Sequence, residues 1–379
     1  MNYLLQLTLI FFCGLNIINA QTYQFETLID VESTNIKNQD RTGTCWSFST
    51  TSFLESEIIR IKGKIIDLSD MYTVRNTYFN KSVNYLYRQG KAQFSEGGLA
   101  HDVINAVKEY GLVPEETFTG LTIDVEKHNH AELVEVLKST LDVYIKKPAK
   151  KLSSKWKLTI ESILDVYLGK KKKEFYFEGN LYTPKSFTKY LEINPSNYIT
   201  LSSFEHVKKY SSFILSIPDN FSNGSFYNVS LDELVNTTIN ALKQGYTIAL
   251  DCDISEKTFS SKHGLAVIPK FVKDQEKSLT MIVEEKKVTP AYRQEEFENF
   301  NTTDDHLMHI VGIVKDQEDN TYFKVKNSWG VDQGNNGYVY MSISYFQLKA
   351  ISVLLHKNAI SKVLKKKLKL ENVVENNNF

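Results

Sequence analysis

Cysteine is scarce in this sequence, which has three such residues among 379: Cys13, Cys45 and Cys252. An exported protein that depended on disulfides for its stability would carry more cysteines, so a disulfide-rich fold is excluded. One bridge between Cys45 and Cys252 stays open as an alternative, and it would remove a free thiol. Cys45 is the cysteine with the most informative sequence around it.

An excess of charge of either sign is also absent, because 45 Lys and Arg residues balance 45 Asp and Glu residues. A chain without a net field gives no reason to expect nucleic acid or an anionic membrane surface as its main partner. Hydrophobic residues make up 42% of the chain and aromatic residues 12%, which is enough for a large core. The sequence therefore predicts a globular protein of one large domain or two lobes, whose function depends on local sites.

Long apolar runs are lacking except at the N-terminus. Residues 1–20, MNYLLQLTLIFFCGLNIINA, form an apolar run that is too short for a comfortable membrane span, and the small Ala20 precedes a polar stretch. This pattern predicts a signal peptide cleaved near Ala20, and hence a secreted or periplasmic protein with no other membrane contact. A membrane anchor retained at this end is the alternative.

Helical periodicity begins at Cys45. The apolar residues after it recur at steps of three and four as far as Ile61, which predicts a helix with one buried face that ends at Gly63. A second helix is predicted over residues 100–110, where Gly111 follows the last periodic residue. The N-terminal half of the chain is therefore expected to be mostly helical.

The composition changes in the middle of the chain. Residues 124–175 are predicted to be charged helices, and they contain ten lysines between Lys146 and Lys173. Such a patch could bind a polyanion, but aromatic residues are sparse there, which favours a solvated helical face. We interpret this stretch as a helical insertion, and residues 358–379 as a polar terminal helix or tail.

The C-terminal half has the pattern of a sheet. Its β-rich runs are separated by turn residues such as DQEDN and DQGNNG, and they predict strands within residues 246–254, 278–288, 308–316, 321–329 and 337–343. These strands suggest an antiparallel sheet or barrel. A helical half followed by a strand-rich half predicts the α+β class, with a cleft between two lobes.

The surroundings of Cys45 suit a reactive thiol. A thiol attacks as the thiolate, and a helix that begins at Cys45 would place its positive end at the sulfur. Gly43 lets the backbone approach closely. Gln39 lies six residues before Cys45, and its side-chain amide could donate to an oxyanion together with the Cys45 N–H.

The segment NQDRTGTCWSFS resembles the cysteine segment of the papain superfamily, in which a Gln precedes a Cys-Trp pair by six residues. In that family a histidine and an asparagine from the other lobe complete the site. The stretch DDHLMHIVGI supplies His306, six residues before Gly312, and VKNSWG supplies Asn327. The order Gln39, Cys45, His306, Asn327 is the order that the superfamily uses.

His309 competes with His306 for the catalytic role. It lies three residues later on the same predicted strand, so its side chain points to the opposite face. A metal site made of the two histidines is disfavoured for the same reason, and no carboxylate or cysteine cluster accompanies them. The sequence therefore predicts His306 as the catalytic histidine, with no metal and no organic cofactor.

The resemblance implies a papain-like two-lobed fold and a role for each residue. Cys45 would attack the scissile carbonyl, and His306 would accept its proton and pass it to the leaving amine. Asn327 would orient the imidazole. Gln39 would stabilise the oxyanion, and the two tryptophans of the motifs, Trp46 and Trp329, would support the site.

Other stretches resemble the bleomycin hydrolase and aminopeptidase C branch of the superfamily. SEGGLAHDV is similar to the segment whose backbone lines the substrate cleft there, which implies substrate contacts for Glu96, Gly97 and Gly98. ALDCDISEKTFSSKHGL resembles a segment that makes Cys252 a structural cysteine. The resemblance implies an aminopeptidase acting on short peptides, and a homohexamer. An open-cleft endopeptidase, a thioester-dependent transferase and a non-catalytic binding protein are the alternatives.

Overall fold

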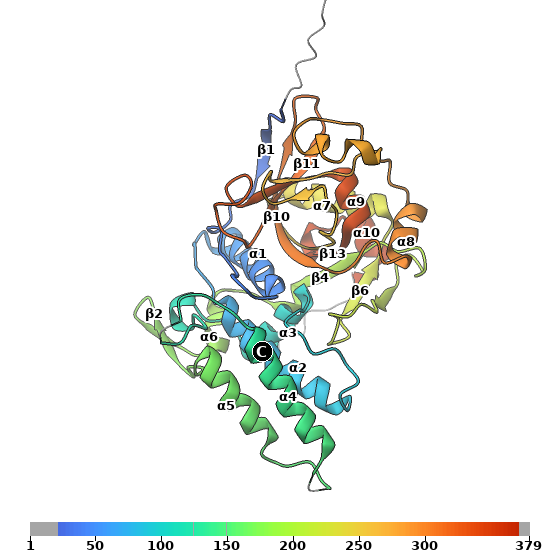
Figure 1. Cartoon of the computed structure of the whole chain (residues 1–379). Coiled ribbons are helices and arrows are strands. Elements are labelled where there is room, and N and C mark those ends of the chain that lie inside the picture. Colours follow the sequence, from blue (N-terminus) through green and yellow to red (C-terminus); the bar gives the residue numbers. More distant parts are fainter. Residues whose placement is uncertain (1–21, 124, 149, 371–379) are drawn as a thin grey trace, which may run out of the picture.

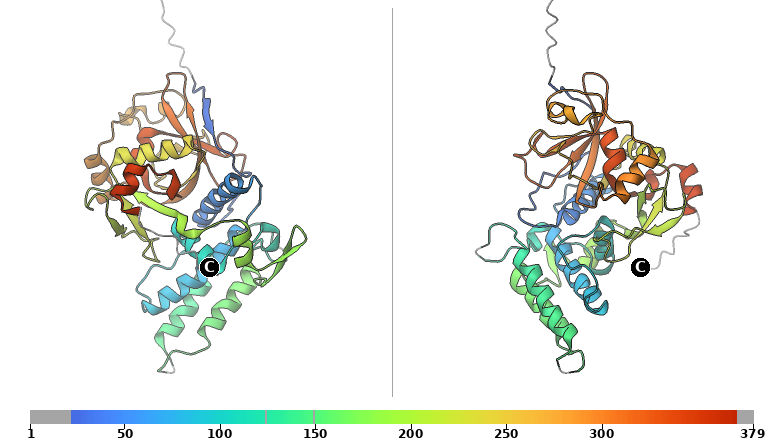
Figure 2. Two further views of the ribbon diagram at one scale, coloured as in Figure 1. Left: turned by 180° about the vertical axis from the view of Figure 1, so that it is seen from behind. Right: turned by 45° about the vertical axis from the view of Figure 1, so that its right-hand side comes forward.

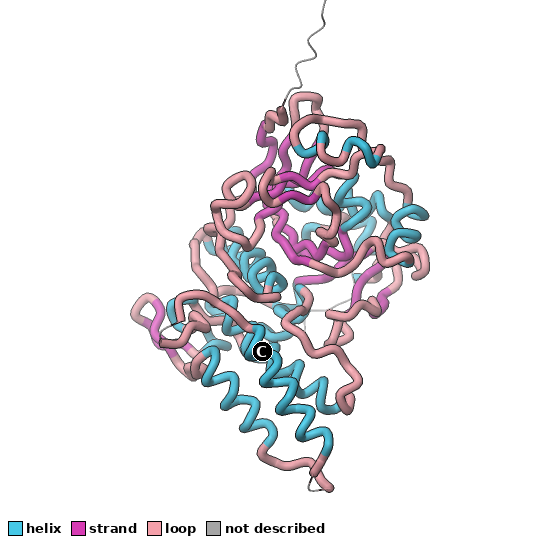
Figure 3. Tube along the Cα trace, viewed as in Figure 1, coloured by secondary structure: helices cyan, strands magenta, loops and turns pink. Residues whose placement is uncertain are grey.

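The computed structural model describes residues 22–123, 125–148 and 150–370. The two halves of the chain differ as the sequence predicts: helices dominate the lower part of Figure 1 and strands the upper part, and the colours of Figure 3 separate the two. The α+β class is therefore confirmed. The predicted signal peptide, residues 1–20, lies outside the described residues.

The helical lobe is built from the N-terminal half. Gly63 ends the first helix at a φ of 62°, which favours glycine, and its N–H bonds to the Ile59 carbonyl. Gly111 ends the third helix with a φ of 84° outside the left-handed helical region, and its N–H bonds to the Val107 carbonyl. Both predicted helix ends are confirmed. The helices are α1 (Cys45–Lys62), α2 (Asp70–Tyr87), α3 (Ala100–Tyr110), α4 (Ala131–Lys146), α5 (Trp156–Leu168) and α6 (Pro184–Tyr190).

The lysine-rich stretch contains α4 and α5, which contact each other and α2. The guanidinium of Arg75 on α2 is buried and forms ion pairs with Glu161 and Asp165 of α5, which fixes these helices together. A two-stranded hairpin, β2 (Phe175–Phe177) and β3 (Asn180–Tyr182), follows. The helices predicted over residues 124–175 are confirmed, and the status of this stretch as an insertion stays a prediction.

Among the described residues, eleven strands form the main sheet of the other lobe. Their order is β5-β6-β4-β13-β7-β10-β11-β12-β9-β8, and β1 pairs with β10 outside this path. Pairing is antiparallel except between β4 and β6 and between β9 and β12. The strands are β1 (Glu26–Asp30), β4 (Tyr198–Ser202), β5 (Ser212–Ile214), β6 (Ser225–Asn228), β7 (Ile248–Cys252), β8 (Phe259–Ser260), β9 (Leu265–Ala266), β10 (His306–Lys315), β11 (Thr321–Lys326), β12 (Tyr338–Ser342) and β13 (Ala350–His356).

One predicted strand, residues 278–288, is wrong. The run begins with a short 3-10 turn, Lys277–Leu279, and continues as an irregular segment that joins its neighbour through an isolated bridge between Pro269 and Glu285. The Lys270 N–H donates to the Glu284 carbonyl and the Lys286 N–H donates to the Ile268 carbonyl, one on each side of this bridge, and the described residues show no strand pairing beyond it. Residues 281–283 are only half-buried, although they are apolar.

Four further helices cover the sheet lobe: α7 (Leu231–Lys243), α8 (Pro290–Glu298), α9 (Ile343–Lys349) and α10 (Lys362–Lys367). The views in Figure 2 show them around the sheet, away from the helical lobe. The segment predicted as a polar tail includes α10. Leu364 and Leu368 from this segment are buried in the core of the sheet lobe, so the segment is part of the fold as far as Leu370.

Helix α1 joins the two lobes. It contacts α2 and α3 on one side and β7 and β10 on the other. The hydroxyl of Ser49 on α1 donates a 2.6 Å hydrogen bond to the Met308 carbonyl of β10. The N-terminus of α1 is therefore held against the first residues of β10.

Candidate active site

Cys45 is the first residue of α1. It therefore lies at the end of the helix where the N–H groups of the first turn have no partner within the helix. Its Sγ accepts a hydrogen bond from the Leu307 N–H of β10 at 3.5 Å. Cys45 and Cys252 are both free and buried, so the alternative of a disulfide between them is wrong. The thiol thus lies at the meeting point of the two lobes, beside the residue that follows His306.

The imidazole of His306 is held by Asn327. The distance from His306 Nε2 to Asn327 Oδ1 is 2.8 Å, and the Ser328 N–H donates to the same oxygen at 2.8 Å. An amide oxygen only accepts, so Nε2 carries the proton in the neutral ring and Nδ1 is the basic nitrogen. The ring of Trp329 stacks on the imidazole, with centroids 4.7 Å apart.

Gln39 is tied to the segment that follows Asn327. Its backbone N–H donates to the Ser328 carbonyl at 2.9 Å, and the Ser328 hydroxyl donates to Gln39 Oε1 at 2.6 Å. The side-chain Nε2 donates to the Thr42 carbonyl at 2.6 Å. An amide nitrogen has two hydrogens, so the second can donate to a bound oxygen.

The segment predicted to contact substrate lies beside the start of α1. The indole of Trp46 donates to the Glu96 carbonyl at 3.0 Å, and the Gly43 N–H donates to the Glu96 carboxylate at 2.6 Å. A methyl group added to Gly98 would lie 3.1 Å from the Trp46 ring, so glycine allows the close approach. The substrate contacts of Glu96, Gly97 and Gly98 stay predictions.

Burial dominates the ionisation of both catalytic candidates. It raises the pKa of Cys45 to about 12, against the smaller opposite effect of the Leu307 N–H. Burial also lowers the pKa of His306 to about 4, against the effect of the bond to Asn327. Among the described residues, no hydrogen bond joins Cys45 to His306. The thiol and imidazole are therefore neutral in this arrangement, and charge separation between them needs a proton transfer.

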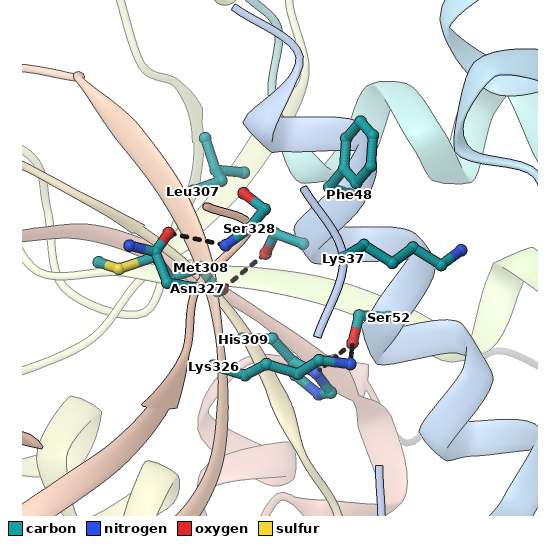
Figure 4. Close-up of a pocket in the computed structure, with 10 residues that line it drawn as sticks. Lys37, Phe48, Ser52, Leu307, Met308, His309, Lys326, Asn327 and Ser328 are labelled. Carbon is teal, nitrogen blue, oxygen red and sulfur yellow. Dashed lines mark hydrogen bonds between the residues drawn. The ribbon is translucent and has the colours of Figure 1, made fainter. Parts of the chain in front are cut away.

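A small pocket lies behind the site, and its lining includes Ser52, His309 and Lys326. Figure 4 shows the Lys326 ammonium and the His309 ring converging on the Ser52 hydroxyl. Lys326 Nζ lies 2.7 Å from Ser52 Oγ, and His309 Nδ1 lies 2.9 Å from it. His309 therefore belongs to a polar network behind the site and not to the pair of Cys45 and His306.

The structure brings Gln39, Cys45, His306 and Asn327 together, as the sequence motifs predict. Two further residues, Leu307 and Ser328, contact the site, and the sequence motifs predicted no role for them. Ser328 follows Asn327 in the motif VKNSWG, so its position was the only sequence signal available for it. Leu307 acts through its backbone N–H, which leaves no signal in the residue type.

The described part of the chain contains no group of three or more His, Cys, Asp or Glu residues arranged to hold a metal ion. In the same part, none of the helices is both long enough and apolar enough to cross a membrane.

Two protein-family models match the chain. The papain family cysteine protease model matches residues 26–190, and the peptidase C1-like family model matches residues 164–376. The two matches overlap and together include Cys45, His306 and Asn327.

Curated relatives match over most of their length. Aminopeptidase G of Lactobacillus delbrueckii subsp. lactis is 24% identical, over 88% of this chain and 83% of that protein. Aminopeptidase C of Listeria monocytogenes is 25% identical over the same shares of the two chains. Aminopeptidase E of Lactobacillus helveticus is 25% identical, over 90% of this chain and 84% of that protein.

The fold matches a solved structure. The crystal structure of PepW from Lactobacillus rhamnosis HN001 superposes with a TM-score of 0.73 over 91% of this chain and 85% of that one, at 20% sequence identity. The predicted papain-like fold is thereby confirmed.

Proposed function

We propose that this chain, which belongs to the peptidase C1-like family of papain-type cysteine peptidases, is an aminopeptidase acting on short peptides. The observation that carries the proposal is the continuous set of bonds from Gln39 through Ser328 and Asn327 to His306, beside the thiol of Cys45. The restriction to free N-termini is supported by the names of the three relatives reported above, all of which are aminopeptidases.

The proposed reaction begins with proton transfer from the Cys45 thiol to Nδ1 of His306. The resulting imidazolium is stabilised because Asn327 Oδ1 accepts its Nε2–H, and the thiolate is stabilised by the N-terminus of α1. The thiolate and imidazolium also attract each other in a buried environment, which offsets the cost that burial imposes on each charge.

Sγ then attacks the scissile carbonyl, and the oxyanion accepts hydrogen bonds from the Cys45 N–H and the second Nε2 hydrogen of Gln39. The imidazolium of His306 gives its proton to the leaving amine, and an acyl-enzyme remains on Sγ. Water, activated by the neutral imidazole, releases the acid and restores the thiol. Trp329 covers the imidazole and limits access of water to its bond with Asn327.

Two parts of the proposal concern where the protein acts and how it assembles. Export rests on residues 1–20 alone, and N-terminal sequencing of the mature protein from the medium or periplasm tests it: a first residue near Gln21 is expected. Assembly into a homohexamer rests on the resemblance to the bleomycin hydrolase branch. Light scattering coupled to gel filtration tests it, and a monomeric mass would contradict it.

The activity is tested with matched fluorogenic amides that have a free or an acetylated N-terminus, under reducing conditions. Wild type is expected to cleave the free form and to leave the acetylated form intact, and Cys45→Ala should cleave neither. Cleavage of both forms would identify an open-cleft endopeptidase. Absence of cleavage together with no labelling of folded, reduced Cys45 by a thiol-reactive, substrate-like inhibitor would indicate a binding protein.

A further inference from the structure

Two buried side chains hold the segment that is predicted to contact substrate. Lys81 Nζ of α2 donates to the Ser95 carbonyl at 2.7 Å and also to the Gly97 carbonyl. The indole of Trp46 donates to the carbonyl between them, that of Glu96, at 3.0 Å. Three consecutive carbonyls are therefore turned toward side chains of α1 and α2.

These bonds also fix the N–H groups of the segment. A peptide unit is planar, so a carbonyl that is held in place sets the direction of the N–H that follows it. The carbonyl of Gly97 in this way orients the N–H of Gly98. Neither the N–H nor the carbonyl of Gly98 has a hydrogen-bond partner among the described residues, so both can pair with the backbone of a bound peptide.

Lys81 is an unusual residue for this position. Only 2% of its surface is exposed, and in the described part of the chain it forms no ion pair. Its Nζ lies 5.3 Å from the centre of the Phe221 ring, in addition to its bonds to the two carbonyls. Burial lowers the pKa of its ammonium, because a buried charge loses water. A methionine would fill a similar space without this cost, so the lysine favours a role beyond packing.

Glu96 connects this segment to the loop before α1. Its carboxylate accepts the Gly43 N–H at 2.6 Å, and its carbonyl accepts the Trp46 indole. A methyl group added to Gly43 would lie 3.0 Å from Glu96 Cβ, so the two segments are in close contact. Gly43 lies two residues before Cys45, and Trp46 lies directly after it. Glu96 therefore holds the chain on both sides of the nucleophile.

We infer that Lys81 is a positioning residue for the proposed reaction: its ammonium orients segment 95–98, and this segment holds the loop before α1 through Glu96. The inference rests on the proposed function and adds a residue that lies outside the motifs of the site. The loop includes Gln39, the proposed oxyanion donor. Lys81 therefore acts on substrate binding and on the oxyanion site together, without touching the reacting atoms.

The thiol and the imidazole have supports of their own. The Leu307 N–H bonds to Sγ of Cys45, and Asn327 bonds to His306. Loss of the Lys81 ammonium leaves these bonds in place and frees two carbonyls of segment 95–98. The variant should therefore bind and turn over substrate poorly while its thiol stays reactive.

The test compares Lys81→Met with wild type in two reactions. The first is cleavage of the free fluorogenic alanine amide, which needs the substrate cleft and the oxyanion site. The second is alkylation of Cys45 by iodoacetamide, a small reagent that forms no oxyanion and needs only the thiolate. We expect kcat/KM on the amide to fall roughly 10- to 100-fold, and the alkylation rate to stay within about threefold of wild type.

Lys171→Met is the matched control. Lys171 is half-buried and donates to Asn76 of α2 at 2.9 Å, and none of its hydrogen bonds among the described residues reaches segment 95–98. This variant should keep both rates. Equal loss of kcat/KM and of alkylation in folded Lys81→Met would mean a structural role and overturn the inference, as would an unchanged kcat/KM.

A double variant tests the link through Glu96. Glu96→Ala removes the acceptor of the Gly43 N–H and should itself lower kcat/KM roughly 10-fold. The loss in Lys81→Met with Glu96→Ala should be smaller than the product of the two single losses, and a loss equal to that product would overturn the link. If thermal unfolding shows that Lys81→Met does not fold, Glu96→Ala alone must show the same split between the two reactions, because it breaks the same link from a half-buried position.

A third reagent separates failure of this role from failure of the proposed function. An alanyl-alanyl chloromethyl ketone occupies the cleft and alkylates Cys45 without cleavage of an amide. Its rate of inactivation, divided by that of iodoacetamide, should fall roughly 10- to 100-fold in Lys81→Met. If wild type cleaves no amide and this ratio falls, the aminopeptidase proposal fails and the positioning role stands. If wild type cleaves the amide and the ratio is unchanged, the positioning role is wrong and the aminopeptidase proposal stands.

Discussion

The two histidines of strand β10 illustrate how one residue type serves two regions of the molecule. His306 and His309 are both buried, and the alternation of a strand directs them to opposite faces. His306 meets Asn327 on the side of the thiol. His309 pairs with Lys326 of β11 and meets Ser52 of α1 on the side of the small pocket.

The two histidines differ in which ring nitrogen takes part in a hydrogen bond. His306 has its Nε2 bonded to Asn327, which leaves Nδ1 to exchange a proton with Cys45. His309 has its Nδ1 bonded to Ser52, and its buried Nε2 has no partner among the described residues. Burial lowers the pKa of both rings, so the pKa alone does not distinguish them. The contacts distinguish them, because His306 directly precedes Leu307, whose N–H donates to the Cys45 thiol, whereas His309 bonds to Ser52.

The largest expected effect comes from His306→Ala. The variant removes the group that accepts the thiol proton and protonates the leaving amine, so kcat/KM on the free alanine amide should fall roughly 10³-fold or more. Because His306 is buried and bonded to Asn327, the variant should also lose stability, so kcat/KM is measured on folded protein. If the folded variant keeps a tenth or more of the wild-type kcat/KM, His306 is not the catalytic base. His309→Gln is the matched comparison.

A smaller loss of activity is expected for Asn327→Ala. The imidazolium of His306 loses the acceptor of its Nε2–H, and the Ser328 N–H loses its partner as well. We expect kcat/KM to fall roughly 10- to 100-fold. Because the bond to Asn327 raises the pKa of His306, the acidic limb of the pH profile should move to lower pH in the variant. An unshifted limb with full activity would contradict the role of Asn327.

Substitution of His309, on the other face of β10, should lower the stability of the protein and leave its catalysis nearly unchanged. His309→Gln weakens the bond to Ser52 and leaves a poorer fit in a buried site, so the free energy of unfolding should fall by about 1–3 kcal/mol. The kcat of the folded variant should stay within about threefold of wild type. Urea unfolding and active-site titration measure the two quantities. A large loss of kcat at unchanged stability would mean that His309 also has a catalytic role.

The sequence predicts the parts of the site that depend on local patterns. The periodicity after Cys45 predicts α1, and Gly63 ends it because its φ of 62° suits glycine. The motifs around His306 and Asn327 place these residues on and just after neighbouring strands, β10 and β11. These predictions succeed because each rests on residues that are adjacent in the chain.

The parts that the sequence did not predict depend on contacts between distant segments. The Leu307 N–H reaches the thiol of Cys45 only because α1 packs against β10, which lies far away in the chain. Strand β1 was missed because four of its five residues are exposed, which weakens the alternation of an edge strand. The run 278–288 has the apolar composition of a strand, but among the described residues it joins its neighbour through a single bridge.

The smallest expected effect concerns Lys326, which lines the small pocket behind the site. Burial lowers the pKa of Lys326 from 10.5 to about 8. Between these values the unfolded chain binds more protons than the folded one, so this lysine makes stability rise with pH there and fall as pH drops toward 8. The rise amounts to about 1 kcal/mol between pH 8 and pH 9.

Lys326→Met should remove this rise, because methionine fills a similar volume and does not titrate. The measurement is the difference in unfolding free energy between wild type and variant at pH 8 and at pH 9, and exposed Lys362→Met is the control. A difference that does not change with pH would mean that Lys326 keeps its ordinary pKa. Its bonds to Ser52 and to the Thr34 carbonyl would then stabilise the ammonium as well as water does.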